Sequence, residues 1–248
     1  MNNLWALTAR EWKSLWYSPI LYVVGAIFLL LQGLVFWLLM LVITDPRVDP
    51  GWTMAQFFFG GSFFYWMAIL IIAPLLTMRT FSEEKRTGSI EFLLTAPVTD
   101  TQVVLSKFLG AWLAYIVLWA ATGPFFLLLR SFTPFDWAPV LTGYLGTWLL
   151  GSVLIAVGLL ASSLTRNQVI AAVLSFVAVL LLFSVGILDA FIKDPDTSKL
   201  IHYCSLIEHL RAFSKGILDT RPLIFYLSFT SLCLFLTQRV IANPRWRS

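Results

Sequence analysis

The sequence predicts an all-α, polytopic membrane protein with six transmembrane helices and no separate soluble domain. Hydrophobic residues make up 59% of the 248 residues and charged residues 12%, about half the charged share of soluble domains. Mean hydropathy is +0.83, and six apolar runs each reach the roughly 20 residues that cross a bilayer as a helix. We therefore expect one transmembrane domain over residues 1–248.

Residues 3–17 predict an amphipathic helix that lies in the headgroup layer. Three tryptophans opposite cations are typical of such an interfacial helix. A short helix packed on a soluble core is the alternative, and the near absence of a soluble core disfavours it. The expected apolar face holds Leu4, Trp5, Thr8, Ala9, Trp12, Leu15 and Trp16. We take Trp5, Arg10, Trp12, Lys13 and Trp16 as the residues that place this interface helix.

The six spans follow in order, and the first begins where Ser18 can cap a helix and Pro19 suits its first position. Gly123-Pro124 in the third span and Pro74 in the second are potential bends. A short polar break at 162–168 predicts a tight hairpin, because a single helix there is too long for one crossing. The predicted spans are 19–43, 54–78, 106–130, 138–163, 167–191 and 222–242.

The cations define the orientation, because Lys and Arg gather on the cytoplasmic side of membrane proteins. The opposite short loops carry only Arg47 and Arg130. We expect both termini in the cytoplasm, with the chain in the inner membrane of a bacterium. The cations on the cytoplasmic side are Arg10, Lys13, Arg79, Lys85, Arg86, Lys107, Arg166, Arg239, Arg245 and Arg247.

The sequence lacks the motifs of several classes of enzyme and transporter. It has no Walker P-loop and no G-x-S-x-G elbow, and His202, Glu208 and His209 have neither zinc-site order nor a further ligand. No ionisable residue lies deep in a span, which disfavours an ion-coupled transporter. We expect no catalytic residue, metal, bound cofactor or nucleic-acid partner, and two free thiols at Cys204 and Cys233.

The densest charge lies at 79–107, between the second and third spans. We expect a helical elbow in two pieces, with Gly88 at the break and Ser89 capping a second helix that Pro97 ends. Thr99 and Gln102 predict a capping box at the start of the third span. A plain solvated loop is the alternative, but it leaves the apolar residues Ile90, Phe92, Leu93 and Leu94 unexplained.

Residues 189–221 form the largest predicted extracytoplasmic segment. Ser198 can cap a short helix at 199–215 that Gly216 ends, and Thr220 can cap the last span. Two alternatives stay open for the apolar side of this helix, which could dip into the outer leaflet or cover the pore mouth. Its apolar positions are Leu200, Ile207, Leu210, Phe213 and Ile217.

The elbow carries a recognisable series: Arg79, Glu84, Arg86, Gly88-Ser89, Glu91-Phe92-Leu93-Leu94, Pro97 and Lys107. With these residues the chain resembles the permease subunits of ATP-binding cassette exporters of the ABC-2 type. Residues 205–241 also resemble one branch of this family, the single-domain permeases associated with gliding motility and with nitrous-oxide reductase maturation.

The resemblance implies that the elbow is a coupling helix that docks into a cytoplasmic ABC ATPase. Two permeases, as a homodimer or a paralogous heterodimer, would assemble with two ATPases that bind ATP and Mg, in contact with membrane lipid. The implied docking residues are Glu83, Glu84, Lys85, Arg86, Gly88, Ile90, Glu91, Phe92, Leu93 and Leu94.

The predicted function is thus that of the membrane subunit of an ATP-driven exporter, with the energy supplied by another chain. The alternative is an ABC-type complex that transmits force to an envelope partner without transport. A membrane enzyme and a secondary transporter are the remaining rivals, and both would act without an ATPase.

Overall fold

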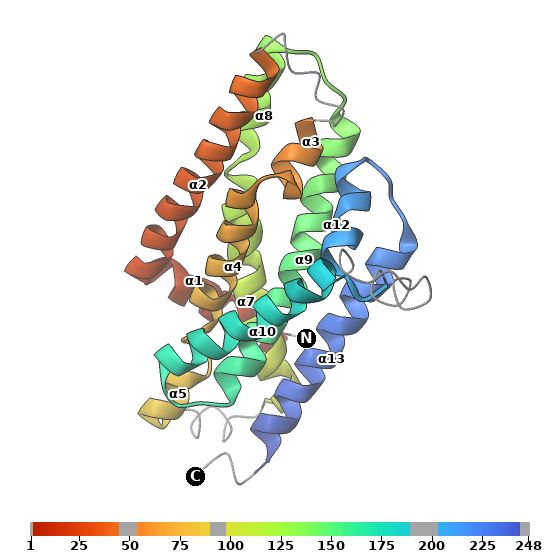
Figure 1. Cartoon of the computed structure of the whole chain (residues 1–248). Coiled ribbons are helices and arrows are strands. Elements are labelled where there is room, and N and C mark those ends of the chain that lie inside the picture. Colours follow the sequence, from red (N-terminus) through yellow and green to blue (C-terminus); the bar gives the residue numbers. More distant parts are fainter. Residues whose placement is uncertain (1, 45–53, 90–97, 189–202, 244–248) are drawn as a thin grey trace.

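The computed structural model describes residues 2–44, 54–89, 98–188 and 203–243, and within these ranges the ordered elements are helices without strands. They form an elongated bundle (Figure 1). Within the same ranges, six helices are long and apolar enough to cross a membrane, which confirms the predicted six-span fold. They are Pro19–Ile43, Phe63–Thr87, Asp100–Phe132, Trp137–Ser163, Gln168–Gly186 and Thr220–Ala242.

The N-terminal segment is a helix, α1 (Asn2–Tyr17), that packs along α7 (Asp100–Ala120). The first span, α2 (Pro19–Thr44), begins at Pro19 as predicted. Its Phe28 ring lies 5.0 Å from Trp119 of α7. Trp119 in turn lies 5.2 Å from Tyr65, so aromatic rings join the first three spans in the core.

The second span differs from the single helix predicted at 54–78. It consists of α3 (Met54–Gln56), the π-helical turn η1 (Phe57–Gly61) and α4 (Phe63–Thr77). Gly60 has φ +105°, a conformation that a Cβ atom disfavours, and Ser62 caps the helix that restarts after it. The sequence Gly60-Gly61-Ser62 therefore lowers the conformational cost of interrupting the helix. Hydropathy does not reveal the interruption, because the residues around it are apolar.

The third span begins earlier than predicted and is also in two pieces, α7 and α8 (Gly123–Phe132). The expected capping box is present, since the Thr99 hydroxyl accepts from the Gln102 amide at 3.3 Å and the Gln102 side chain accepts from the Thr99 amide at 3.1 Å. The break lies just before Gly123-Pro124, as expected.

The fourth span, α9 (Trp137–Ser163), is the centre of the bundle (Figure 1). Its most apolar stretch is 83% buried, against 44% or less for the other spans, and it packs against α4, α7, α10, α12 and α13. Small residues on this helix allow the neighbouring backbones to approach closely. After a tight turn, α10 (Gln168–Leu188) follows, which confirms the predicted hairpin.

The C-terminal part contains α12 (Leu206–Ser214) and the last span, α13 (Thr220–Ala242). Residues 199–202 of the predicted outer helix lie outside the described residues. The single helix predicted at 199–215 is wrong in its described part, because Ser205 is non-helical and caps a new helix, α12. Gly216 with φ +84° follows the end of α12 as predicted. Asp219, one residue before the expected Thr220, caps α13. Cys204 is exposed, Cys233 is buried, and both are free thiols as expected.

Candidate functional site

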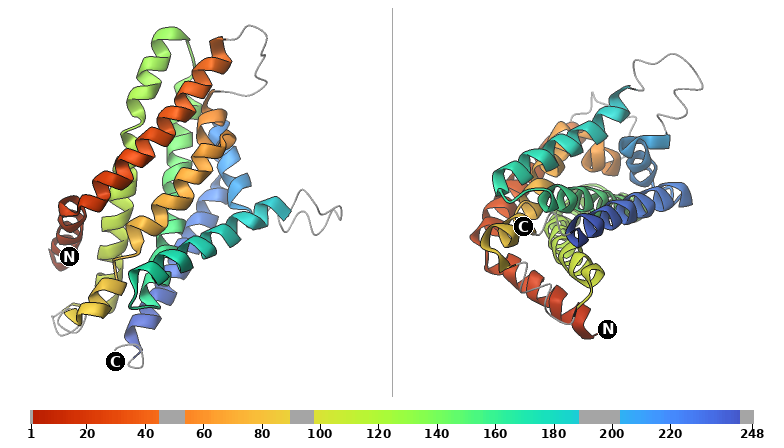
Figure 2. Two further views of the ribbon diagram at one scale, coloured as in Figure 1. Left: turned by 60° about the vertical axis from the view of Figure 1, so that its left-hand side comes forward. Right: turned by 90° about the horizontal axis from the view of Figure 1, so that it is seen from below.

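The charged elbow begins with α5 (Ser82–Thr87), a six-residue helix at the end of the bundle where α13 also ends (Figure 2). Glu83 and Glu84 lie in its first turn and Lys85 and Arg86 in its last, which matches the polarity of the helix dipole. Gly88 has φ +72° and ends the helix in the left-handed conformation typical of this position. The predicted break in the elbow is therefore at Gly88.

A serine of α9 fixes the start of this helix. The Ser162 hydroxyl accepts hydrogen bonds from the backbone amides of Phe81, at 3.1 Å, and Ser82, at 3.2 Å. It also donates to the Met78 carbonyl at 3.2 Å. The first amides of a helix lack partners within the helix, so Ser162 supplies what α5 itself cannot. The Lys85 ammonium donates to the neighbouring Ser163 carbonyl, which adds a second link to α9.

A buried lysine joins α5 to α7. The Lys107 side chain is only 2% exposed, and its Nζ lies 2.6 Å from Oε1 of Glu84. The same nitrogen lies 5.3 Å from the centre of the Phe81 ring. An unpaired buried ammonium is very unfavourable, so the Glu84 carboxylate supplies a counter-charge that the burial of Lys107 requires.

The same lysine also reaches α1. Its Nζ lies 3.4 Å from Oε1 of Glu11, which in turn accepts from Arg10 at 2.8 Å. This contact requires α1 and α7 to be close, and Gly110 permits it, because a Cβ at that position would lie 2.9 Å from the Glu11 Cβ. We call Arg10, Glu11, Glu84 and Lys107 the charge knot; its two cations and two carboxylates link α1, α5 and α7.

The outward side of α5 carries two of the charges predicted for docking. Glu83 and Arg86 face each other at 3.9 Å, with side chains 42% and 62% exposed. Glu84 is turned inward and is 21% exposed. The structure therefore separates two adjacent glutamates: Glu83 lies on the surface and Glu84 lies in the charge knot. The predicted docking residues Ile90, Glu91, Phe92, Leu93 and Leu94 lie outside the described residues.

The residues predicted for the interface helix divide between two surfaces of α1. Trp12 and Trp16 are half-buried, with ring centres 5.6 Å apart, and pack against the core. Arg10 and Lys13 are exposed, and Trp5 is 68% exposed although it was expected on the apolar face. Contact with the headgroup layer stays a prediction for this helix.

Sequence reasoning missed Glu11 and Ser162 and gave Lys107 no contact. A signal for Glu11 was present, since it is the only acidic residue among residues 1–44. A half-buried acid needs a counter-charge, and Glu11 has Arg10 on its own helix and Lys107 on the helix packed against it. Ser162 offered no comparable signal, because its function depends on how α9 meets the elbow.

Other candidate groups have ordinary structural contacts. His209 packs on Phe225 at 4.6 Å, and its Nε2 lies 3.0 Å from the Tyr203 carbonyl oxygen. Among the described residues, no group of three or more His, Cys, Asp or Glu side chains could hold a metal ion. The elbow is thus a junction of four helices. Hydrogen bonds join α5 to α9, and ion pairs join α1, α5 and α7.

The model of the family described as ABC-2 family transporter protein matches residues 5–247. None of the curated proteins matches the chain.

Proposed function

The chain belongs to the ABC-2 family of transporter proteins, and from that premise we propose that α5 is the point at which an ABC ATPase docks and drives an exporter. Membership makes the chain a multi-pass permease component of an ABC transporter, which works with an ATPase and a second permease. The proposal adds the docking site, the outward direction of transport, and an orientation with both termini in the cytoplasm.

The charge knot is the observation that carries the proposal. Lys107 contacts carboxylates from both α1 and α5 while it is itself part of α7. A displacement of α5 by a partner cannot leave α1 and α7 in place without separating buried opposite charges, which is costly. The junction can therefore pass a movement of the ATPase to three helices at once.

The hydrogen bonds of Ser162 connect the elbow to the centre of the bundle as well. They join the first turn of α5 to the end of α9, the most buried span. Because α4 leads directly into α5, a push on the elbow acts on the second, third and fourth spans together. This is the property that a coupling element needs.

The exposed side of α5 is the proposed contact surface. Glu83 and Arg86 present opposite charges there, and such surface charges define the register and selectivity of a protein interface more than its raw affinity. Glu84 has a different role, because its carboxylate already pairs with Lys107. Glu84 is a bracing residue, and Glu83 and Arg86 are the docking residues.

Charge reversal on the exposed side tests the docking proposal. Glu83→Arg combined with Arg86→Glu should abolish co-purification of the co-expressed ATPase, while the protein still inserts and elutes as the wild type. Arg239→Glu is the matched control, since Arg239 is an exposed cation near the same end of the bundle, stacked on Phe235 at 4.8 Å. Full retention of the ATPase by the double variant would refute docking at α5.

Outward transport, rather than force transmission to an envelope partner, is supported by the similarity of residues 79–107 to exporter elbows. The similarity to the gliding-motility branch stays a prediction. An ATPase activity of the assembled complex that rises with added cargo would favour transport, and an activity that responds only to an envelope partner would favour force transmission.

A further inference from the structure

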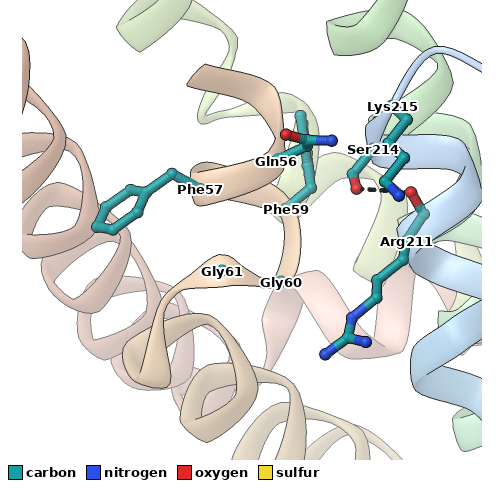
Figure 3. A pocket seen from close by; sticks show the side chains of 8 residues that line it. All are labelled: Gln56, Phe57, Phe59, Gly60, Gly61, Arg211, Ser214 and Lys215. Atoms are coloured by element: carbon teal, nitrogen blue, oxygen red, sulfur yellow. Dashed lines mark hydrogen bonds between the residues drawn. The ribbon is translucent and has the colours of Figure 1, made fainter. Parts of the chain in front are cut away.

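The interruption of the second span borders a cavity that the docking proposal does not use. The cavity has a volume of about 560 Å³ and lies between η1 and α12, at the end of the bundle opposite α5 (Figures 1 and 3). Non-helical backbone at membrane depth is tolerated where it is covered by protein or borders a polar cavity. The cavity thus accounts for where the break is, and it is within the size range of ligand sites.

On one side of the cavity, a hydrogen bond stabilises the non-helical backbone of the break. Gly60 has φ +105°, and its carbonyl accepts from the Trp66 indole at 2.8 Å, so the turn cannot relax into a continuous helix without losing this bond. The next helix, α4, begins two residues after Gly61, and a helix N-terminus contributes positive potential. Gly60 and Gly61 line the cavity beside this N-terminus.

The other side of the cavity is basic. Arg211 and Lys215 project from the end of α12, and the Arg211 guanidinium extends toward the break (Figure 3). Glu208 pairs with one nitrogen of Arg211 but does not line the cavity. Because a guanidinium has five N–H donors, further donors remain for a ligand. The charged residues among those that line the cavity are both cations.

The position of the break in a membrane-spanning segment indicates which kind of anion could bind there. The 15 residues of α4 extend about 22 Å at 1.5 Å per residue, less than the roughly 30 Å hydrocarbon core, so α4 alone is too short to cross it and the second span needs the residues of the break as well. Phe57 and Phe59 line the cavity, and Phe63, two residues after the lining residue Gly61, is 75% exposed. Cations beside exposed apolar surface at this depth suit a molecule with an anionic head and acyl chains.

We propose that this cavity binds the phosphate headgroup of an anionic phospholipid, with Arg211 and Lys215 on the phosphate and the acyl chains along the exposed apolar surface next to Phe63. The proposal is independent of the ATPase. In this proposal, the break in the second span forms part of a lipid-binding site.

Native mass spectrometry of the purified full-length chain tests it, with phosphatidylglycerol titrated against phosphatidylcholine. The wild type should bind phosphatidylglycerol in preference. Each cation near a membrane surface contributes about fivefold to anionic-lipid affinity, so Arg211→Gln with Lys215→Gln should weaken binding about 30-fold. Arg130→Gln is the matched control, because Arg130 is an exposed cation near the same end of the bundle.

Two further arms make the test specific. Glu208→Gln should bind phosphatidylglycerol at least as tightly as the wild type, because it removes the carboxylate that competes for Arg211. Soluble glycerol 3-phosphate should bind far more weakly than the lipid. Unchanged binding by the double variant, an equal loss in Arg130→Gln, or equally tight binding of glycerol 3-phosphate would each overturn the proposal.

Discussion

Replacing Lys107 by methionine removes the centre of the charge knot and leaves two carboxylates without their shared cation. Methionine keeps the length and apolar stem of lysine but cannot pair with Glu84, 2.6 Å away, or with Glu11, 3.4 Å away. Both carboxylates are mostly buried, at 21% and 16% exposure. Removing one partner of a buried ion pair typically costs about 3–5 kcal/mol.

The size of this effect can be measured by thermal unfolding of the purified protein in detergent. For a chain of this size, 1 kcal/mol corresponds to about 2–4 °C in Tm, so Lys107→Met should lower the Tm by roughly 6–20 °C. Arg239→Met removes an exposed cation near the same end of the bundle and should change stability by less than about 0.5 kcal/mol.

A compensating variant separates charge from packing. Lys107→Met with Glu84→Gln leaves no unpaired charge at that contact, and Glu11 retains Arg10 at 2.8 Å. The double variant should therefore be more stable than the sum of the two single losses predicts, with a coupling energy of about 1–3 kcal/mol between the two sites. A small loss in Lys107→Met, or a double variant that is as unstable as the sum of the single ones, would refute the account of the charge knot.

Two other changes test the remaining links of the elbow by the same Tm measurement. Ser162→Ala removes the acceptor of two backbone amides and should cost about 1–3 kcal/mol, whereas Ser163→Ala, whose hydroxyl bonds only its own helix, should cost less. Gly110→Ala places a Cβ against Glu11 and should destabilise by about 1–3 kcal/mol, whereas Gly33→Ala, with open space around it, should be neutral or stabilising. Equal effects within either pair would contradict the assigned contacts.

The features that could be predicted from the sequence are local ones. The capping box of Thr99 and Gln102 needs only residues three positions apart, and the end of α5 at Gly88 needs only one residue without a Cβ. Six spans follow from the lengths of apolar runs, because the bilayer imposes a length on each. These elements could be placed without knowledge of how the helices pack.

The charge knot could not be predicted in this way, because its members come from distant parts of the chain. Lys107 lies 23 residues after Glu84 and 96 after Glu11, and nothing local selects Glu84 over the adjacent Glu83. The choice depends on the rotation of α5, which Ser162 fixes from α9. The break at Gly60 was missed for a different reason, since phenylalanines before and after it keep the hydropathy of the span high.

Site-specific photocrosslinking tests the central claim, docking of the ATPase on the exposed side of α5, most directly. A photoreactive amino acid at position 86 should crosslink to the co-expressed ATPase in membranes. The same group at position 130, in α8 at the opposite end of the bundle, should not. A crosslink at position 130, or none at position 86 while the complex still co-purifies, would contradict the account.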